Sequence, residues 1–101
     1  MSELNTEKTE SEMDMDRLAS HAEKCLTLMR SRNAKYGSAW KKINWQTFAW
    51  ICSMKLNRGM EQDLNNPDPK MIDEFMDVAN YCFMAIDCLI KDFGQDPEAH
   101  L

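Results

Sequence analysis

Apolar side chains recur at spacings of three and four along the C-terminal third of the chain, without a miss, and Gly94 follows them. This spacing is typical of a helix with one buried face. Neighbouring apolar residues widen that face to about half of the circumference at ~100° per residue. We therefore expect the helix to be covered on more than one side. The repeating residues are Ile72, Phe75, Ala79, Cys82, Ile86, Leu89 and Phe93.

A second periodic segment lies nearer the N-terminus, after a polar stretch. Residues 1–12 lack periodic apolar positions and are expected to form a disordered tail. Ser11 can cap a helix through its hydroxyl, with Asp14 three residues further on. Apolar residues at helical spacing then predict a helix that runs to about Asn33, and Gly37 ends the segment.

The central segment predicts one more helix, and a proline-containing break separates it from the last one. Asn44 fits the cap of a helix that runs toward Leu64. Gly59 predicts an early end or a kink there, because glycine inside a helix costs about 1 kcal/mol relative to alanine. Asp68 is expected to cap the last helix, with Pro69 at its first position.

Together these segments predict one all-α domain, a small bundle of about three main helices. The helical domain is expected at residues 13–94, and a C-terminal tail at residues 95–101. Two helices of the same chain are expected to leave part of the last helix uncovered. We therefore expect oligomerisation, with further copies of the chain completing the bundle.

Charge and hydropathy exclude several classes of partner. The net charge of −5 and the pI near 4.9 disfavour general nucleic-acid binding, which needs a clustered basic surface. The longest apolar stretch is far shorter than the ~20 residues that span a bilayer, so we expect no membrane partner. No leader sequence is visible, and a cytoplasmic location is the default expectation.

The cysteines show no pattern of a metal site. Cys25, Cys52, Cys82 and Cys88 form no C-x-x-C pair, and no histidine lies near them at the spacing of a zinc site. Each cysteine falls within an apolar helical pattern. Reduced thiols buried in the core are therefore favoured over disulfides.

Two acidic residues on the last helix are candidates for metal binding. Glu74 and Asp77 are one turn apart, so their carboxylates project from the same face. Two carboxylates at this spacing can share Mg²⁺ through oxygen ligands, as in sites that act on phosphates. Taken alone, the pair is better explained as acids near a helix start that complement the helix dipole and face water.

Two basic residues with the same spacing lie on the central helix. Lys55 and Arg58 share a stripe with apolar residues, so they lie beside the packing face. They could pair with Glu74 and Asp77 across the helix interface, as structural ion pairs of small net value. They could equally bind phosphate, with Arg as a bidentate donor and Lys as a point charge. The residues alone do not decide between these readings.

The segment that follows the first helix combines a cation, two aromatic rings and a glycine. Lys35, Tyr36 and Trp40 flank Gly37 within six residues. Aromatic rings beside cations suit a nucleobase and its phosphate. A glycine that ends a helix, with aromatic rings folded over the end of the bundle, is the favoured reading of the segment by itself.

The order of these motifs resembles that of a known family. The chain is similar to the nucleotide modification associated domain 1 family, found largely in phages and bacteria. The last motif also looks like the third-helix E-x-x-D signature of MazG-like all-α nucleotide pyrophosphohydrolases. The motifs are Lys35-Tyr36-Gly37-Ser38-x-Trp40, Lys55-Leu56-Asn57-Arg58 and Asp73-Glu74-x-x-Asp77-Val78-Ala79-Asn80-Tyr81.

The resemblance implies an all-α, usually oligomeric protein with a nucleotide or nucleotide-like ligand near the helix-three acids. In a catalytic form, Glu74 and Asp77 would be the catalytic and metal-binding residues, and Mg²⁺ would activate water against a nucleoside triphosphate. The location would then be the host cytoplasm if a phage encodes the chain. The remaining residues would contact the ligand: Lys35, Tyr36, Trp40, Lys55, Arg58, Asn80 and Tyr81.

One departure from the MazG-like pattern leaves the function open between three hypotheses. MazG-like enzymes carry an E-E-x-x-E pattern on the earlier helix, where this chain has Lys55 and Arg58. The first hypothesis is a nucleotide-handling domain in nucleotide metabolism or DNA-base modification, which as an enzyme would be a Mg-dependent pyrophosphohydrolase. The second is a non-catalytic protein that binds and sequesters a nucleotide or cyclic nucleotide, as counter-defence proteins do. The third is a structural helical interaction module.

Overall fold

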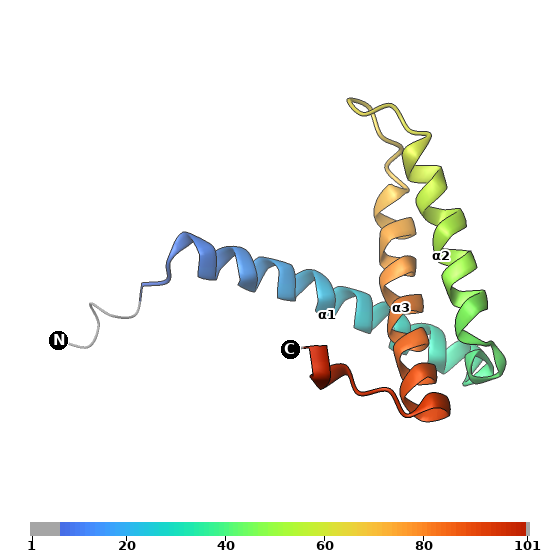
Figure 1. Cartoon of the computed structure of the whole chain (residues 1–101). Helices are drawn as coiled ribbons and strands as arrows, with labels where there is room; N and C mark the ends of the chain where they lie inside the picture. The colour runs from blue at the N-terminus through green and yellow to red at the C-terminus, as the bar shows by residue number, and fades with distance from the viewer. Residues whose placement is uncertain (1–6, 101) are drawn as a thin grey trace.

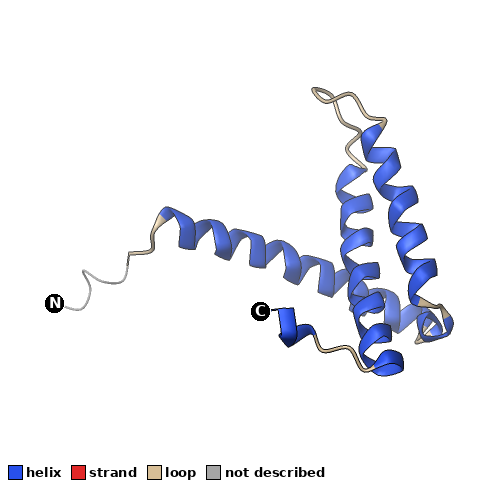
Figure 2. Cartoon of the chain, in the orientation of Figure 1, coloured by secondary structure: helices blue, strands red, loops and turns tan. Residues whose placement is uncertain are grey.

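The fold is all-α, as the sequence predicts. The computed structural model describes residues 7–100, and these contain helices but no strand (Figure 2). None of these helices is both long enough and apolar enough to cross a membrane. The elements are α1 (Glu10–Tyr36), the 3-10 helix η2 (Ala39–Lys42), α2 (Trp45–Met60), α3 (Met71–Phe93) and the 3-10 helix η3 (Pro97–His100).

Helix α1 begins earlier and ends later than the sequence analysis predicts. Thr9 is its cap: the Thr9 hydroxyl oxygen accepts a hydrogen bond from the backbone N–H of Glu12, at 3.1 Å. The prediction that Ser11 is the cap is therefore wrong. Residues 10–12 of the predicted tail are helical, and residues 1–6 lie outside the described part of the chain. Gly37 ends α1 with a φ of 66°, a conformation that glycine adopts without a steric penalty.

Helix α2 begins as predicted and stops early. The Asn44 side-chain oxygen accepts a hydrogen bond from the backbone N–H of Thr47 at 2.8 Å, which confirms Asn44 as the cap. The helix continues through Gly59, ends at Met60 and does not reach Leu64. A Cβ atom at Gly59 would lie 3.0 Å from the terminal methyl group of Met71, a tight contact that a small movement of this flexible side chain would relieve.

Helix α3 ends at the predicted glycine but starts two residues late. Asp68 is not its cap, and Pro69 is not its first residue. The Asp68 side chain instead accepts the N–H of Lys70 at 2.9 Å, and the Asp68 carbonyl accepts the N–H of Met71 at 2.9 Å. These bonds form a turn before the helix. Gly94 ends α3 in the left-handed conformation, and its backbone N–H donates a hydrogen bond to the carbonyl oxygen of Ile90.

Helix α3 is the central element, because both α1 and α2 pack on it. Figure 1 shows α2 and α3 as an antiparallel hairpin, with α1 crossing its lower part. The C-terminal part of α1 contacts α3, and its N-terminal part projects away from the hairpin. This arrangement brings residues of α1 beside the middle of α3.

The buried core of the described residues is small. The Phe48 side chain is fully buried, and its ring stacks on Tyr81 with the centroids 5.9 Å apart. Three cysteines complete the apolar core. All four cysteines are free thiols, but Cys82 is exposed, so the prediction that it belongs to the core is wrong. The buried cysteines are Cys25, Cys52 and Cys88.

The most regular stripe of the sequence does not face the core. Helix α3 is covered on two sides, by α1 and α2, as its wide apolar face predicts. Most residues of the repeating stripe lie on a third side and are exposed, because the packed sides use the neighbouring helical positions. The exposed members are Ile72, Phe75, Cys82, Ile86 and Phe93.

Candidate functional site

Five charged residues from all three α-helices form one connected cluster, which we call the ion-pair cluster. Lys55 of α2 lies 3.1 Å from Asp77 and 3.4 Å from Glu74, both on α3. Arg58 of α2 bonds the other oxygen of Glu74 at 2.9 Å. Arg32 of α1 bonds Asp77 at 2.6 Å. The predicted acidic and basic pairs therefore face each other, and α1 adds a third cation.

The cluster is well shielded at its centre and open at its edges. The side chains of Lys55, Glu74 and Asp77 are 17%, 21% and 15% exposed, whereas Arg32 and Arg58 are about half exposed. Burial alone would raise the pKa of Asp77, but hydrogen bonds from Arg32 and Lys55 outweigh it and hold that pKa below its usual value. Burial likewise opposes the charge of Lys55, yet Asp77 and Glu74 raise its pKa.

Replacing Asp77 by Asn is expected to lower the free energy of unfolding by about 1 kcal/mol at neutral pH, because two cations lose their shared partner. A carboxyl whose pKa is lowered by folding stabilises the fold above its unfolded pKa of about 3.9. That contribution is lost as the pH falls through the lower folded pKa. The difference between wild type and Asp77→Asn should therefore shrink below about pH 4.

Urea unfolding, followed by far-ultraviolet circular dichroism at neutral and acidic pH, measures this difference. The matched control is Asp92→Asn, since Asp92 is an exposed carboxylate on the same helix. It should change stability by less than about 0.5 kcal/mol. A difference for Asp77→Asn that stays constant from neutral pH to about pH 3 would contradict the ion-pair assignment.

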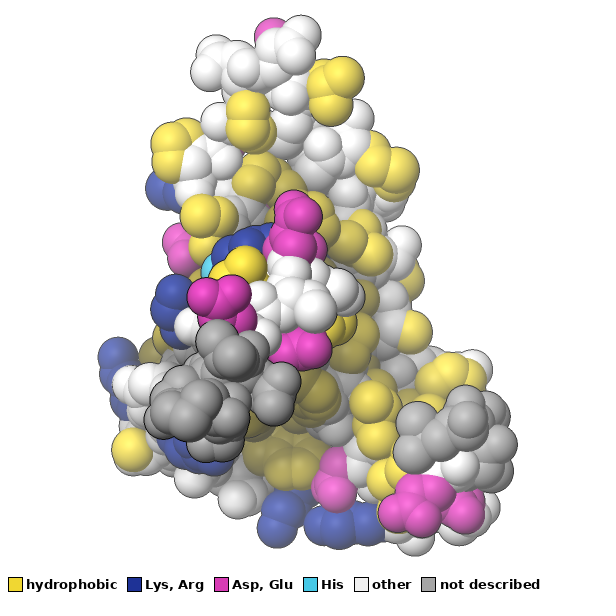
Figure 3. Space-filling view, turned by 90° about the vertical axis from the view of Figure 1, so that its left-hand side faces the viewer, with side chains coloured by type: hydrophobic (Ala, Val, Ile, Leu, Met, Phe, Trp, Pro, Cys, Tyr) yellow, Lys and Arg dark blue, Asp and Glu magenta, His cyan; other side chains and the backbone are white. Residues whose placement is uncertain are grey.

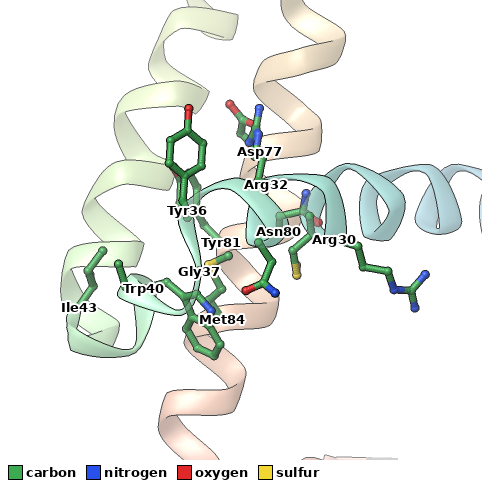
Figure 4. Close-up of a pocket in the computed structure, with 13 residues that line it drawn as sticks. Arg30, Arg32, Tyr36, Gly37, Trp40, Ile43, Asp77, Asn80, Tyr81 and Met84 are labelled. Carbon is green, nitrogen blue, oxygen red and sulfur yellow. The ribbon is translucent and has the colours of Figure 1, made fainter.

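A pocket of about 480 Å³ adjoins the ion-pair cluster, between the C-terminal end of α1, η2 and α3. Its volume lies within the range of about 300–1,000 Å³ that is common for small-molecule sites. Met29, Ile43 and Met84 contribute apolar wall. Figure 4 shows Arg32 beside Asp77 in the pocket wall, and Arg30 extending away from the other labelled side chains. The polar and aromatic lining residues are Arg30, Arg32, Asn33, Tyr36, Trp40, Asp77, Asn80 and Tyr81.

Asn80 is a buried polar residue with half of its amide unused. It is 4% exposed, and its side-chain nitrogen donates a hydrogen bond to the Cys25 carbonyl oxygen at 3.0 Å. Because a carbonyl can only accept, the orientation of the amide is fixed by this bond. The Asn80 oxygen has no partner within the described residues. An unpaired buried acceptor costs about 1–3 kcal/mol, so a ligand donor that satisfies it would be favoured.

The structure divides the predicted site residues into two adjoining groups. Tyr36, Trp40, Asn80 and Tyr81 line the pocket, whereas Lys55, Arg58 and Glu74 belong to the ion-pair cluster. Asp77 belongs to both groups. Lys35 is outside both: its ammonium lies 5.3 Å from the centre of the Tyr36 ring, over its face.

Arg32 and Met29 of α1 line the pocket but were not among the predicted site residues, unlike Tyr36 at the end of the same helix. Arg32 and Tyr36 are four residues apart, and Met29 and Arg32 are three apart, so these side chains lie along neighbouring parts of one helix face. That spacing alone could have linked Arg32 to Tyr36. It could not have shown that this face meets Asp77, which lies 45 positions further along the chain.

The donor set does not fit a magnesium ion in this arrangement. Glu74 and Asp77 already accept hydrogen bonds from three cationic side chains. Within residues 7–100 no three His, Cys, Asp or Glu side chains come together at a possible metal site. A divalent cation here would meet three positive charges against two carboxylates. The excess of positive charge suits an anion better, and the magnesium site remains a prediction of the resemblance.

Comparisons with known proteins add no family or structural relative. Neither a scan against protein-family models nor searches of curated proteins and solved structures found a match.

Proposed function

We propose that the chain binds a nucleotide, or a similar anion with a planar ring, in the pocket between α1 and α3, without hydrolysing it. The observation that carries this proposal is the buried amide of Asn80: its oxygen has no partner within the described residues, and the residue lines a pocket that also has aromatic and cationic side chains. A nucleotide offers a donor-bearing base edge, a flat ring and a phosphate. The pocket has a complementary group for each.

The aromatic side chains would hold the base. Tyr81 is kept in place by its stacking on Phe48, at an interplanar angle of 30°. Trp40 and Tyr36 bring two further rings to the pocket. Base stacking on an aromatic side chain contributes about 1–3 kcal/mol per base and tolerates any base. These rings therefore favour a planar ligand without selecting which one.

Asn80 would bind the edge of the base. Its nitrogen donates to the Cys25 carbonyl oxygen, and its own oxygen has no partner within the described residues, so the oxygen is available to a donor on the ligand. A base can donate to this oxygen from an exocyclic amino group, as in adenine, cytosine or guanine, or from a ring N–H, as in thymine, so this contact favours a base edge without selecting which base. The oxygen exposes less than 1 Å² in the free protein, so a wall side chain must move when the base enters.

The ion-pair cluster would hold the phosphate end. Arg32 lines the pocket and is about half exposed, so its guanidinium can exchange part of its contact with Asp77 for a bidentate contact with phosphate. Lys55 and Arg58 add positive charge nearby. Glu74 and Asp77 form ion pairs with these cations. In this proposal the two carboxylates position the cations, and the bound ligand is released without being hydrolysed.

A thermal-shift screen and calorimetry test the proposal. The panel contains the four deoxynucleoside mono- and triphosphates and a cyclic mononucleotide, each with and without Mg²⁺. At about 100 times its dissociation constant, a ligand adds roughly 2.7 kcal/mol to the stability of the folded state. We expect metal-independent binding and intact ligand after denaturation of the complex.

Other outcomes separate the competing functions. Release of pyrophosphate that needs Mg²⁺ and is lost in Glu74→Gln would contradict binding without hydrolysis and support the pyrophosphohydrolase. The absence of any shift across the panel would contradict nucleotide binding altogether. The ion-pair cluster would then be a structural link between α1, α2 and α3, as in an interaction module.

A further inference from the structure

Large apolar side chains form a continuous stripe on the outer side of α3, which we call the α3 stripe. Their exposures run from 39% to 69%, and they follow the length of the helix. Its members follow one another at spacings of three or four residues, except for the eight residues from Phe75 to Phe83, and such spacing is typical of a surface that packs against another helix. Figure 3 shows hydrophobic side chains gathered on this side of the molecule. The α3 stripe consists of Ile72, Phe75, Phe83, Ile86, Ile90 and Phe93.

Helix α1 carries a second uncovered stripe on its projecting part, residues 10–24, which we call the arm. Every residue from 15 to 24 is exposed. Met15, Leu18 and Ala22 continue, at helical spacing, the face that Cys25 buries against α3. The packing face of α1 therefore extends beyond its own hairpin. Most of the stability of a helix in a protein comes from packing of its apolar face, so a partner surface would stabilise the arm.

The chain also exposes far more surface than a compact monomer. Its accessible surface is 8401 Å², whereas about 5,900 Å² is expected for a compact protein of its mass of 11.8 kDa. Its radius of gyration is 17.4 Å, against about 13 Å for a compact domain of this length. The arm and the uncovered side of the hairpin account for this open shape (Figure 1).

The uncovered apolar area matches what a dimer needs. At roughly 200 Å² for each large apolar side chain, the α3 stripe with Met15 and Leu18 exposes on the order of 800 Å². Each partner in a standard-size interface buries about 800 Å². A two-fold dimer uses the same surface on both chains. The α3 stripe and the arm of one copy can therefore pack against the α3 stripe and the arm of the other.

We infer that a second copy of this chain covers the α3 stripe, and that the arm of each copy packs on the hairpin of the other. A helical partner fits the repeat of the stripe, and the chain itself supplies a helix with an unpartnered face of the same character. No residue of the α3 stripe lines the ligand pocket, and neither does Met15 or Leu18 of the arm.

Sedimentation equilibrium of the full chain tests this inference. Wild type is expected at twice 11.8 kDa at micromolar concentration. Ile86→Glu in the α3 stripe and Leu18→Glu in the arm each place two charges in a two-fold interface. Each should weaken dimerisation by roughly 100-fold. The matched control, Trp50→Glu, changes an apolar residue of α2 that is 66% exposed and lies outside both stripes, and it should remain a dimer.

Each possible result decides the question. A wild-type mass of 11.8 kDa at all concentrations would refute the dimer and would point to a different helical partner. A dimer that persists in Leu18→Glu would refute the role of the arm. Leu18 is 54% exposed, so its substitution leaves the fold of the monomer intact even if Ile86→Glu perturbs it. Nucleotide binding does not enter this measurement, so the two proposals fail independently.

Discussion

Replacing Phe48 by alanine is expected to lower the free energy of unfolding by about 3–5 kcal/mol, the range for removing a buried phenyl ring. Phe48 is the one large side chain of the described residues that is fully buried. It joins α2 to α3 by stacking on Tyr81. Small domains have a total stability of about 5–15 kcal/mol, so this single loss would remove a large share of it.

Urea unfolding at one fixed protein concentration measures the effect of Phe48→Ala, because the stability of an oligomer depends on concentration. Trp50→Ala is the control: it removes a larger ring that is 66% exposed, and it should change stability by less than about 0.5 kcal/mol. A loss below about 1 kcal/mol for Phe48→Ala would show that this side chain is not the centre of the core.

Replacing Trp40 by alanine is expected to weaken nucleotide binding by roughly 5- to 150-fold, the equivalent of about 1–3 kcal/mol of lost stacking. Trp40 lines the pocket from η2 and is not fully buried, so the fold should survive its removal. Calorimetric titration with the nucleotide that binds best measures the change in affinity.

The chain supplies a matched control for Trp40→Ala. Trp45 begins α2 and does not line the pocket, so Trp45→Ala should leave the affinity unchanged. Equal losses for the two variants would indicate a general effect on the fold rather than lost stacking. An affinity unchanged in Trp40→Ala would contradict the position of the base.

Local sequence signals predicted the helices well where a side chain or a glycine fixes the boundary. Asn44 caps α2 and Gly94 ends α3 because each acts through bonds to residues a few positions away. Thr9 and Ser11 offer the same hydroxyl chemistry two residues apart, and the sequence alone does not distinguish them as caps of α1. Asp68 was misplaced because an aspartate organises a turn as readily as it caps a helix.

Orientation was the part of the fold that sequence could not provide. The regular spacing from Ile72 to Phe93 identifies an apolar helix face, but it does not state which partner covers that face. The structure assigns α1 and α2 to other sides of α3. Two helices do leave part of α3 uncovered, as expected. The uncovered part is the most regular apolar stripe of the chain, which the sequence led us to expect in the core.

The ion pairs of the candidate site could be predicted from the sequence, but the way in which three helices come together to form the site could not. Lys55 and Arg58 contact Glu74 and Asp77, as the structural reading of the sequence expected. Arg32 joins the ion-pair cluster only because α1 crosses α3. This is a long-range contact that no local pattern of the sequence predicts. This crossing also creates the pocket, so the binding surface emerges only with the tertiary structure.

The central claim is that a nucleotide occupies the pocket between α1 and α3, and the indole N–H signals of the tryptophans test it most directly. A ¹H–¹⁵N spectrum resolves Trp40, Trp45 and Trp50 separately, and only Trp40 lines the pocket. On titration with deoxyadenosine monophosphate, we expect the Trp40 signal and the Asn80 side-chain amide to shift, with Trp45 and Trp50 unmoved. Unchanged Trp40 and Asn80 signals at millimolar nucleotide would contradict the account.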